Sequence, residues 1–476
     1  MIQSTSGIPR VILETHPLYL WAKSDPQTFL QNIGELYRQA YGIEMIASEN
    51  MPTEAVLAAL SSVANNKYAE GLPGKGKRYY GGCEFVDGME EASIRRAKTL
   101  FSAKHANVQP HSGTQANQAV YLALMNPGEK ILSLKLEHGG HLSHGSKVNA
   151  VGTFYKIVQY ELNPEGRMDY DRIRDMAKRE KPKVIVVGGS AYPRTIDFGI
   201  CRGIADETNS YLVSDIAHIA GLIAAGLHPS SIDHAHATTT TTHKTLRGPR
   251  GGMILLGHDY DMIIGHTEDG KPIKLYQAID KAVFPGNQGG PLEHVIAAKA
   301  IAFKEALNST ETEVGADFIN YQKATLDNAR FLAKLLIEKG YELSSGGTEN
   351  HLVLVKRPRG LTGKAAQYAT ELIGIATNKN TVPYDKETPF VTSGLRLGTP
   401  AITTRGIGED GIRLIVDSLD QLFSHTAEDD KHVPSAPEDL TRRLKLGIED
   451  LCRQYSIYPN QVQAAEFVMN ELGLII

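Results

Sequence analysis

Short apolar segments alternate with helical ones through the middle of this chain, from about residue 90 to residue 256. The apolar segments are four or five residues long and rich in β-branched side chains, which is typical of strands buried on both faces. Helical spacing is clearest at 116–125 and 170–179. Strands are predicted at 130–134, 183–187, 211–214, 238–242 and 252–256. Because strands that alternate with helices form a mostly parallel sheet with helices on both faces, we predict the α/β class.

The pattern changes after residue 291, where long helical segments replace the alternation. Helices are predicted at 292–307 and 316–339, followed by a strand at 351–356 and a helix at 363–373. This order predicts a smaller α+β domain, joined to the first through the long helices. We therefore divide the chain into an N-terminal arm with helices, a large domain and a small C-terminal domain. The predicted bounds are 1–60, 61–315 and 316–476.

The charge balance argues against some classes of partner. The net charge is −4 at neutral pH, so neither nucleic acid nor an anionic membrane is expected as the main partner. No stretch approaches the roughly 18 apolar residues of a membrane helix, and the start of the chain lacks a basic segment followed by an apolar one. The expected compartment is the cytoplasm. The cysteines, Cys83, Cys201 and Cys452, are odd in number and far apart, which argues against a disulfide framework and a cysteine zinc site.

A lysine follows the run of threonines at 238–242. At the end of a β-branched strand in an α/β sheet, Lys244 would stand where an imine-forming amine is placed. Such an amine needs burial and nearby cations to lower its pKa, and Arg247 and Arg250 follow closely. The pattern taken alone fits a surface lysine equally well.

An aspartate changes that balance. Asp215 ends the predicted strand 211–214 and precedes Lys244 by 29 positions. Pyridoxal phosphate needs a carboxylate on its ring nitrogen, because the protonated ring then accepts carbanion electrons. A single aspartate at a strand end is usually a helix cap, but an aspartate combined with a lysine at the end of the following strand favours this cofactor. His218 lies near the same strand end and could contact the cofactor oxygen or the substrate.

Two further segments are suited to anions. Ser112, Gly113 and Thr114 precede a predicted helix, where free N–H groups and the helix dipole favour a phosphate. A plain N-cap is the alternative. Arg396 stands in an apolar, strand-like run at 392–399. A buried arginine needs an anion, either a structural carboxylate or a substrate carboxylate held by two hydrogen bonds.

Three histidines, His138, His141 and His144, have the spacing of a metal site. No carboxylate pair or cysteine accompanies them, and Gly139 and Gly140 interrupt the helix that would align them. No metal is therefore predicted, and an imidazole stacked on a flat cofactor ring is the favoured use.

Two other motifs fail at one position. Residues 71–78 nearly match a phosphate-binding loop, but Arg78 replaces the final hydroxyl residue that would bind magnesium. Ser190 is not in a G-x-S-x-G turn, because Tyr192 stands where the second glycine should be. Neither an ATPase nor a serine hydrolase is predicted.

Taken together, these segments resemble the serine hydroxymethyltransferase family, whose members are pyridoxal-phosphate enzymes of fold type I. The resemblance runs from about residue 43 to about residue 406. It is carried by 46–50 (IASEN), 66–71 (NKYAEG), 78–84 (RYYGGCE), 111–117 (HSGTQAN), 240–252 (TTTHKTLRGPRGG) and 284–291 (FPGNQGGP). It implies a large domain around a mostly parallel seven-stranded sheet flanked by helices, plus a smaller C-terminal α+β domain.

The resemblance also implies a role for each matched residue. Lys244 would form a Schiff base with pyridoxal phosphate, Asp215 would pair with its ring nitrogen, and Glu70 would do acid–base work at the serine hydroxymethyl group. With His141 and Thr241, these residues form the implied catalytic set. The cofactor would also contact Ser112, Gly113, Thr114, His141 (stacked on the ring), Ser190, His218, His243, Gly289 and Gly290. The substrate would contact Ser48, Tyr68, Glu70, Tyr80, His218 and Arg396, and folate would lie near Leu136, Gly140, Leu142 and Asn350.

The implied reaction is the reversible conversion of serine and tetrahydrofolate into glycine, water and 5,10-methylenetetrahydrofolate. The implied assembly is a homodimer with shared active sites, which can pair again into a dimer of dimers; Glu70, the two tyrosines and the glycine pair would come from the neighbouring chain. A threonine aldolase or an alanine-racemase-like enzyme of the same fold is the alternative, and folate dependence distinguishes them. A folate- or RNA-binding protein without catalysis is disfavoured by the flat charge balance and by the combination of Asp215 with Lys244.

The chain departs from the family pattern in two places. The loop at 73–80 carries two more residues than the usual Pro-Gly-Lys-Arg-Tyr-Tyr spacing, and it leads directly to Tyr79 and Tyr80. The segment at 257–282 is also extended.

Overall fold

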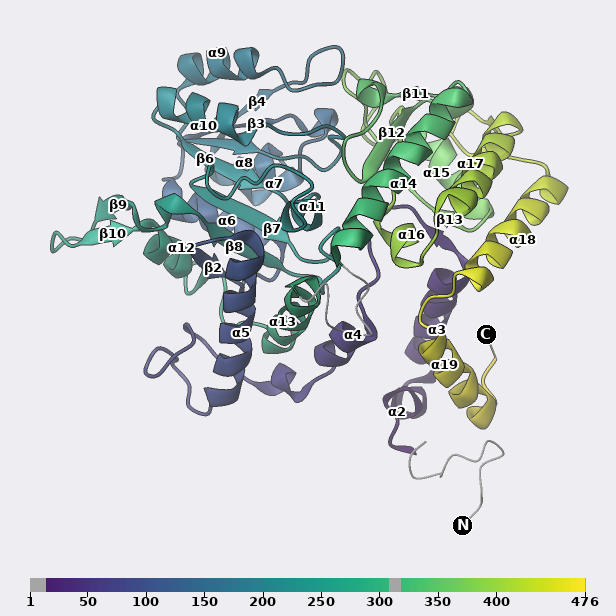
Figure 1. Cartoon of the computed structure of the whole chain (residues 1–476), viewed down its shortest axis with the longest axis horizontal. Helices are drawn as coiled ribbons and strands as arrows, with labels where there is room; N and C mark the ends of the chain where they lie inside the picture. The colour runs from purple at the N-terminus through teal and green to yellow at the C-terminus, as the bar shows by residue number, and fades with distance from the viewer. Residues whose placement is uncertain (1–13, 308–317, 476) are drawn as a thin grey trace.

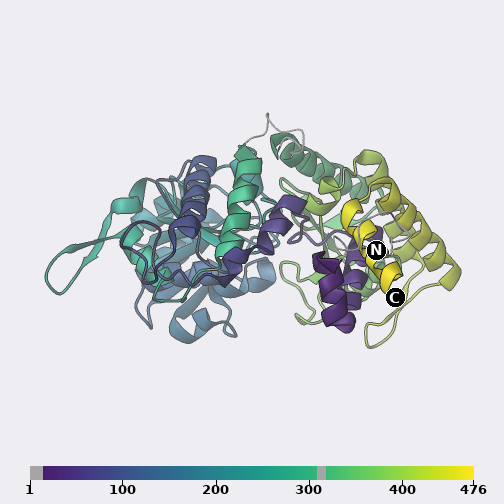
Figure 2. The same cartoon turned by 90° about the horizontal axis from the view of Figure 1, so that it is seen from below.

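The computed structural model describes residues 14–307 and 318–475, which form two lobes (Figure 1). The larger lobe is built around a seven-stranded sheet and the smaller one around a four-stranded sheet. Figure 2 shows the two lobes side by side. No helix within the described ranges is long and apolar enough to cross a membrane. The three cysteines are buried and free.

The large sheet has the strand order β2-β8-β7-β6-β5-β3-β4. Its strands are β2 (His105–Asn107), β3 (Lys130–Leu134), β4 (Lys156–Tyr160), β5 (Val184–Val187), β6 (Tyr211–Asp215), β7 (Ala237–Thr241) and β8 (Gly252–Leu256). The strands from β4 to β7 pair in parallel, whereas β8 runs antiparallel to both of its neighbours. The predicted α/β class with a mostly parallel seven-stranded sheet is confirmed, and the five predicted strands are found within one residue of their bounds.

Apolar side chains on each strand alternate between two hydrophobic cores. In β5, Val184 and Val186 belong to one core, and Ile185 and Val187 belong to the other. The first core is covered by helices α6 (Gly113–Leu124) and α12 (Leu275–Val283). The second is covered by α5 (Glu84–Phe101), α9 (Tyr170–Glu180), α10 (Phe198–Glu207) and α13 (Glu293–Leu307). Since successive residues face opposite sides of a sheet, a strand covered on both sides is apolar throughout.

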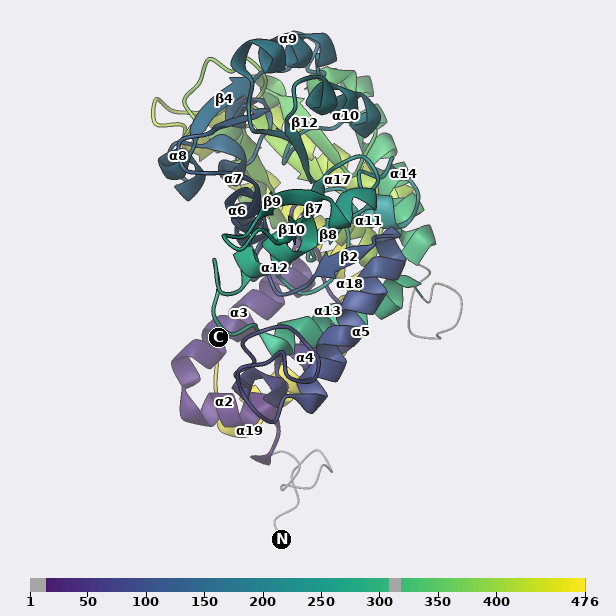
Figure 3. The same ribbon diagram turned by 90° about the vertical axis from the view of Figure 1, so that its left-hand side faces the viewer.

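Within the segment 257–282, β9 (Ile263–His266) and β10 (Pro272–Lys274) form a hairpin that projects from the large lobe (Figure 1). That this segment is longer than the family pattern stays a prediction. On the opposite side of the large lobe from α12, helices α5 and α13 run side by side (Figure 3). Helix α4 (Glu54–Leu60) packs against α13.

The small lobe is an antiparallel sheet of order β11-β12-β15-β14 with helices packed on it. The strands are β11 (Glu342–Leu343), β12 (Leu352–Lys356), β14 (Asn378–Asn380) and β15 (Gly394–Gly398). The helices are α14 (Phe318–Glu338), α15 (Gly363–Leu372), α17 (Glu409–Ser424) and α18 (Glu438–Gln454). This lobe has the α+β organisation that the sequence predicts.

The N-terminal segment joins the small lobe rather than standing apart. Strand β1 (Ile43–Glu44) pairs in parallel with β13 (Ile375–Ala376). Helices α2 (Pro17–Ser24) and α3 (Pro26–Tyr41) share a hydrophobic cluster with α19 (Pro459–Leu472). The predicted boundary at 60/61 stays a prediction, and the one at 315/316 lies outside the described residues.

Candidate active site

A cavity of about 430 Å³ opens at the edge of the large sheet where β5, β6 and β7 end. The small lobe closes its other side through Arg396 on β15, and the segment that follows β1 contributes Ser48. Parallel strands bring their carboxyl ends to one edge, so residues far apart in sequence meet there. The residues from the predicted site that line the cavity are Ser48, Ser112, Gly113, Thr114, His141, Ser190, Asp215, His218, Thr241, His243, Lys244 and Arg396.

Asp215 ends β6, and both of its carboxylate oxygens accept hydrogen bonds. His144 Nε2 and Asn117 Nδ2 each donate to Oδ2 at 2.9 Å, and the Ala217 N–H donates to Oδ1 at 3.0 Å. Burial by itself raises the pKa of Asp215, but the hydrogen bond and charge of His144, the charge of His141 and the hydrogen bond from Asn117 outweigh burial and hold this pKa well below its usual range. The carboxylate is therefore ionised at neutral pH.

Lys244 lies three residues beyond the end of β7 and is buried. Burial lowers its pKa to about 8; Asp215 opposes this shift, and Arg396 and Arg250 add to it. About a tenth of the amine is thus neutral at pH 7, far more than for an ordinary lysine, and the neutral amine is the form that imine formation requires. The prediction of a nearby cation holds for Arg250. It is wrong for Arg247, whose guanidinium packs over the Tyr321 ring at 4.6 Å.

The start of α6 forms the anion-binding end of the cavity. Ser112 caps this helix, since its Oγ accepts from the Gln115 N–H at 3.2 Å, so the simple capping reading is confirmed. The cap does not exclude a ligand, because Ser112, Gly113 and Thr114 also line the cavity together with Arg250. A Cβ on Gly113 would lie 2.7 Å from Thr241 Cγ2, so this end of the cavity depends on a glycine.

Three cavity histidines are neutral at neutral pH, mainly because they are buried. Burial lowers the pKa of His141 to about 4 and that of His243 to about 3, and it holds that of His218 well below its usual range; nearby cations add to each shift. His141 accepts from the Ser143 N–H through Nδ1 at 3.2 Å, which fixes the ring at the start of the short helix α7 (Leu142–Gly145). His218 stacks on His351 with ring centroids 5.4 Å apart.

Arg396 is buried, and its hydrogen bonds go to neutral acceptors. It donates to the Ser190 carbonyl at 2.6 Å, to Asn378 Oδ1 at 3.0 Å and to Ser48 Oγ at 3.4 Å. Burial lowers its pKa to about 10, and Glu49 opposes that shift. Because none of the three bonded groups carries a charge, the guanidinium can still bind a carboxylate that enters beside Ser48.

A second group of predicted residues lies away from the cavity. The rings of Tyr68 and Tyr80 meet edge to face at 5.0 Å, and both are exposed. A Cβ on Gly290 would lie 3.1 Å from the Tyr68 ring, and one on Gly289 would lie 3.4 Å from Glu70 Oε1. The structure therefore gathers Tyr68, Glu70, Tyr80 and the glycine pair into one cluster, but none of them lines the cavity.

The predicted folate contacts also lie outside the cavity lining. Leu142 is exposed and Leu136 is half-buried, whereas Gly140 and Asn350 are buried. The Asn350 amide is engaged within the chain: its Nδ2 donates to the Tyr192 carbonyl at 2.9 Å, and its Oδ1 accepts from the Leu352 N–H at 3.1 Å. The folate role of these residues stays a prediction.

Sequence reasoning missed several residues of the site. Glu49, His144, Gly189 and Ala217 line the cavity without a predicted contact, and Asn117 holds Asp215 from α6. His144 belongs to the histidine motif, but its partner Asp215 is 71 positions away. Possible metal-ligand atoms of His141, His144 and Asp215 lie within 4.8 Å of one another, but the atoms of His144 and Asp215 are paired in a hydrogen bond.

These groups fit pyridoxal phosphate. The cavity volume lies in the range of about 300–1,000 Å³ that is usual for cofactor sites. It combines a buried amine with a lowered pKa, an ionised carboxylate, a neutral imidazole and a helix N-terminus. These match the aldehyde, ring nitrogen, ring face and phosphate of the cofactor.

Comparison with known proteins agrees with the site. A family model described as serine hydroxymethyltransferase matches residues 21–419. A curated serine hydroxymethyltransferase from Rippkaea orientalis (strain PCC 8801 / RF-1) is 53% identical over 435 residues, which cover 91% of this chain and 95% of that protein. The match extends beyond the segment of about 43–406 on which the resemblance was based. The chain therefore belongs to the serine hydroxymethyltransferase family.

Proposed function

We propose that this chain catalyses the reversible conversion of L-serine and tetrahydrofolate into glycine, 5,10-methylenetetrahydrofolate and water, with pyridoxal phosphate bound covalently to Lys244. One observation carries the proposal. A buried lysine amine and an ionised aspartate stand at the ends of neighbouring parallel strands, in one cavity with an arginine whose hydrogen-bond partners are neutral. Family membership supports the same activity.

Different groups in the cavity are suited to different parts of the cofactor. When bound, pyridoxal phosphate supplies an electron sink that lets the bond between Cα and Cβ of serine break. Asp215 would keep the ring nitrogen protonated, because a carboxylate with so low a pKa would not take that proton back. Ser112, Gly113 and Thr114 would hold the phosphate at the start of α6. His141, as a neutral imidazole, would cover the ring face.

Arg396 and Ser48 orient the substrate. Their 3.4 Å contact places a charged fork and a hydroxyl side by side, so both can bind the serine carboxylate. Orientation would matter here, because a π electron sink can take electrons only from a bond that lies parallel to its p orbitals. Glu70 takes and returns the proton at the serine hydroxymethyl oxygen.

The site is completed by a second copy of the chain. Glu70, Tyr68, Tyr80 and the glycine pair form one cluster off the cavity, with both tyrosines exposed, and this supports a homodimer in which the cluster reaches the neighbour's cavity. A mixture of Glu70→Gln and Lys244→Ala chains tests this assembly. Each mixed dimer has one site with both native residues, so co-refolded chains should regain about a quarter of native turnover. No recovery would contradict the shared site.

Folate dependence tests the reaction itself. The purified protein is loaded with pyridoxal phosphate, glycine is added, and a reduced folate is titrated in while the visible spectrum is recorded. A long-wavelength band that grows only with folate is expected. A spectrum that ignores folate would contradict the proposal and leave an aldolase or racemase of the same fold. The compartment proposed for this reaction is the cytoplasm.

A further inference from the structure

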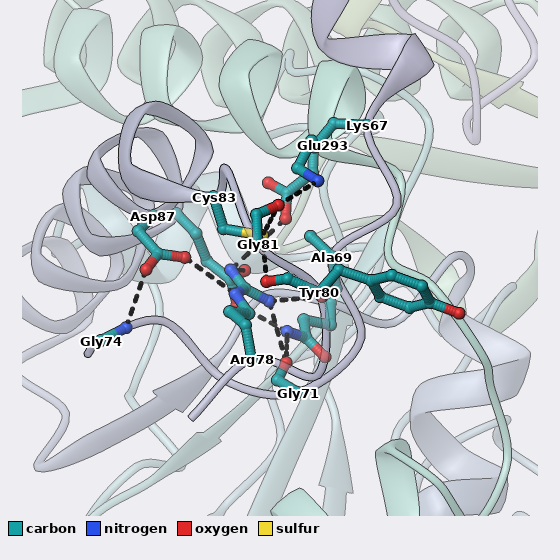
Figure 4. Close-up of polar contacts among 12 residues, drawn as sticks. Lys67, Ala69, Gly71, Gly74, Arg78, Tyr80, Gly81, Cys83, Asp87 and Glu293 are labelled. Carbon is teal, nitrogen blue, oxygen red and sulfur yellow. Dashed lines mark hydrogen bonds and ion pairs between the residues drawn. The ribbon is translucent and has the colours of Figure 1, made fainter. Parts of the chain in front are cut away.

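A buried ion cluster holds the two residues that flank Glu70 in the chain, Ala69 and Gly71 (Figure 4). Its centre is Arg78, whose side chain is 4% exposed. The Arg78 guanidinium donates to Asp87 Oδ1 at 2.8 Å through Nε, and to Glu90 Oε2 at 2.7 Å and Glu293 Oε1 at 3.4 Å through Nη2. A guanidinium supplies these donors in a fixed plane, so the three carboxyl groups also fix its orientation.

The remaining nitrogen of Arg78 holds the chain on both sides of Glu70. Nη1 donates to the Ala69 carbonyl at 2.7 Å and to the Gly71 carbonyl at 2.9 Å. The Glu70 carbonyl between them accepts from the Tyr79 N–H at 3.0 Å. Three consecutive carbonyls, centred on Glu70, are thus bound by Arg78 and the residue that follows it.

Gln109, two residues beyond the end of β2, supports the same contacts. Its Nε2 donates to the Gly71 carbonyl at 2.9 Å and to Glu90 Oε1 at 2.8 Å. Glu90 is on α5 and Glu293 begins α13, the two helices that run side by side in Figure 3. The Glu70 backbone is therefore tied to rigid elements of the large lobe and not only to its own loop.

The tip of the 73–80 loop lies outside these contacts. Gly71 and Arg78 form an antiparallel bridge that closes the loop at its base. Within the loop, the Lys77 N–H donates to the Gly74 carbonyl at 3.1 Å, and the Gly74 N–H donates to Asp87 Oδ2 at 3.1 Å. Residues 75–77 are exposed. These exposed residues form the tip of the loop, and Tyr79 and Tyr80 follow the bridge at its base.

The charge of the cluster explains why an arginine is needed. Three carboxyl groups surround one guanidinium, and burial raises the pKa of Glu293 to about 8 and also that of Glu90, despite the attraction of Arg78. A permanently charged residue keeps the cluster together, because arginine does not lose its proton in proteins.

We propose that Arg78 is a positioning residue for Glu70: by binding the carbonyls of Ala69 and Gly71, it sets the position of the acid–base carboxyl. Because these contacts lie at the base of the 73–80 loop, the position of Glu70 does not depend on the length of that loop. The inference deepens the proposed function and rests on it, since that function gives Glu70 its proton transfer.

The test compares Arg78→Lys with Arg96→Lys in the full-length holoenzyme. Lysine at 78 keeps the charge that the carboxyl groups need, but one ammonium cannot reach both carbonyls and the carboxylates together. Arg96 is a matched control, because it also joins α5 to α13, donating to the Ala300 carbonyl at 2.7 Å, and lies away from Glu70. Serine turnover is measured alongside amide hydrogen exchange over residues 68–81.

For Arg78→Lys we expect exchange over 68–81 to rise about tenfold or more, and kcat to fall by about 100-fold with KM for serine changed less than about threefold. Arg96→Lys should leave kcat and that exchange unchanged. Native kcat and native exchange in Arg78→Lys would overturn the proposal. An equal rise in exchange throughout the chain in both variants would also overturn it.

Two further variants keep the proposal open to refutation. If Arg78→Lys does not fold, Gln109→Met removes one donor from the Gly71 carbonyl without a charge change. The proposal then requires faster exchange over 68–81 in Gln109→Met.

Deleting Lys75 and Gly76 restores the usual loop length, and kcat should then stay within about twofold of the native value. A large loss of kcat would contradict the claim that the position of Glu70 does not depend on the length of the loop. Exchange is measurable without turnover, so a wild-type protein lacking folate-dependent activity would refute the proposed function and leave this exchange test intact.

Discussion

The cavity and the junction of α13 with the large sheet each contain a buried lysine, and the two lysines differ in their hydrogen bonds. Lys244 faces Asp215, Arg396 and Arg250 across the cavity. The Lys299 ammonium donates to the carbonyls of Val108, Pro110 and Gly252 at 2.7, 3.2 and 2.8 Å. Burial lowers both pKa values, to about 8 and about 7. Three carbonyls match the three protons of Lys299, so this lysine is structural, whereas Lys244 faces a cavity where it can react.

Two buried arginines repeat this contrast. Arg396 lines the cavity, and its hydrogen bonds leave it open to a substrate carboxylate. Arg405 donates to five backbone carbonyls, which belong to the ends of α3 and α18 and the residues just beyond them: Gln39, Ala40, Gly42, Cys452 and Tyr455. Burial lowers the pKa of both arginines. A lowered pKa therefore does not distinguish a reactive buried cation from a structural one. What distinguishes them is whether backbone carbonyls already accept hydrogen bonds from all of the cation's N–H groups.

The largest expected effect is that of Lys244→Ala on turnover. Removing the only proposed covalent attachment for the cofactor should lower serine turnover by about 1,000-fold or more. The thermal unfolding midpoint of the cofactor-free protein should not fall below that of the wild type at neutral pH, because the variant loses no side-chain hydrogen bond and no longer buries a charged amine. Native turnover in this variant would refute the role of Lys244.

Lys299→Met should act on stability instead. The substitution leaves three buried carbonyls without a donor, which should lower the free energy of unfolding by about 3 kcal/mol or more. Urea denaturation measures this loss. Lys304→Met, on the exposed face of the same helix, is the control and should change stability by about 0.5 kcal/mol at most. Equal values for the two variants would contradict the structural role of Lys299.

The pH dependence of stability sharpens the contrast further. In the cofactor-free fold the pKa of Lys244 is about 8, against 10.5 for an ordinary lysine. Between these values the unfolded chain binds the extra proton, so stability rises with pH across this window. The contribution is about 3 kcal/mol. Comparing wild type with Lys244→Met from pH 7 to pH 11 isolates it, and identical slopes would show that Lys244 does not titrate in this range.

Lysine variants of the two arginines should differ in what they impair: Arg396→Lys should weaken substrate binding, and Arg405→Lys should lower stability. Arg396→Lys loses the planar fork and should lower kcat/KM for serine by about 30-fold, mainly through KM. Arg405→Lys should keep KM and lower the free energy of unfolding by about 1–2 kcal/mol, because one ammonium cannot serve five carbonyls. Steady-state kinetics and urea denaturation on both variants check the pair. A KM effect in Arg405→Lys would break the distinction.

Much of the fold follows from local pattern. The strands at the centre of the large sheet are continuous apolar runs because both faces are covered, and such runs are visible without a structure. Strand β2 has three residues, and β4 includes Lys156 and Gln159, so neither has that pattern. The antiparallel direction of β8 is also invisible locally, since a buried strand has the same composition in either direction.

Those parts of the site that carry a local sequence signal were predictable. Lys244, Asp215 and the start of α6 are marked by strand ends and a capping sequence, and they meet because parallel strands end at one edge. His144 and Asn117 were missed, because their role depends on contacts with Asp215 across 71 and 98 positions. Arg78 was noticed as the failed position of a phosphate loop and as part of a family motif, but its role as a bridge between two helices was not predicted.

Residue order thus established the five central strands of the large sheet and the long helices, and which kinds of chemistry could gather at the end of the sheet. Packing alone decided which buried cation is free to react. The acceptors of Lys299 lie 191, 189 and 47 positions from it in the chain. A lysine's reactivity depends on whether such distant carbonyls occupy its protons, and only the folded chain brings them together.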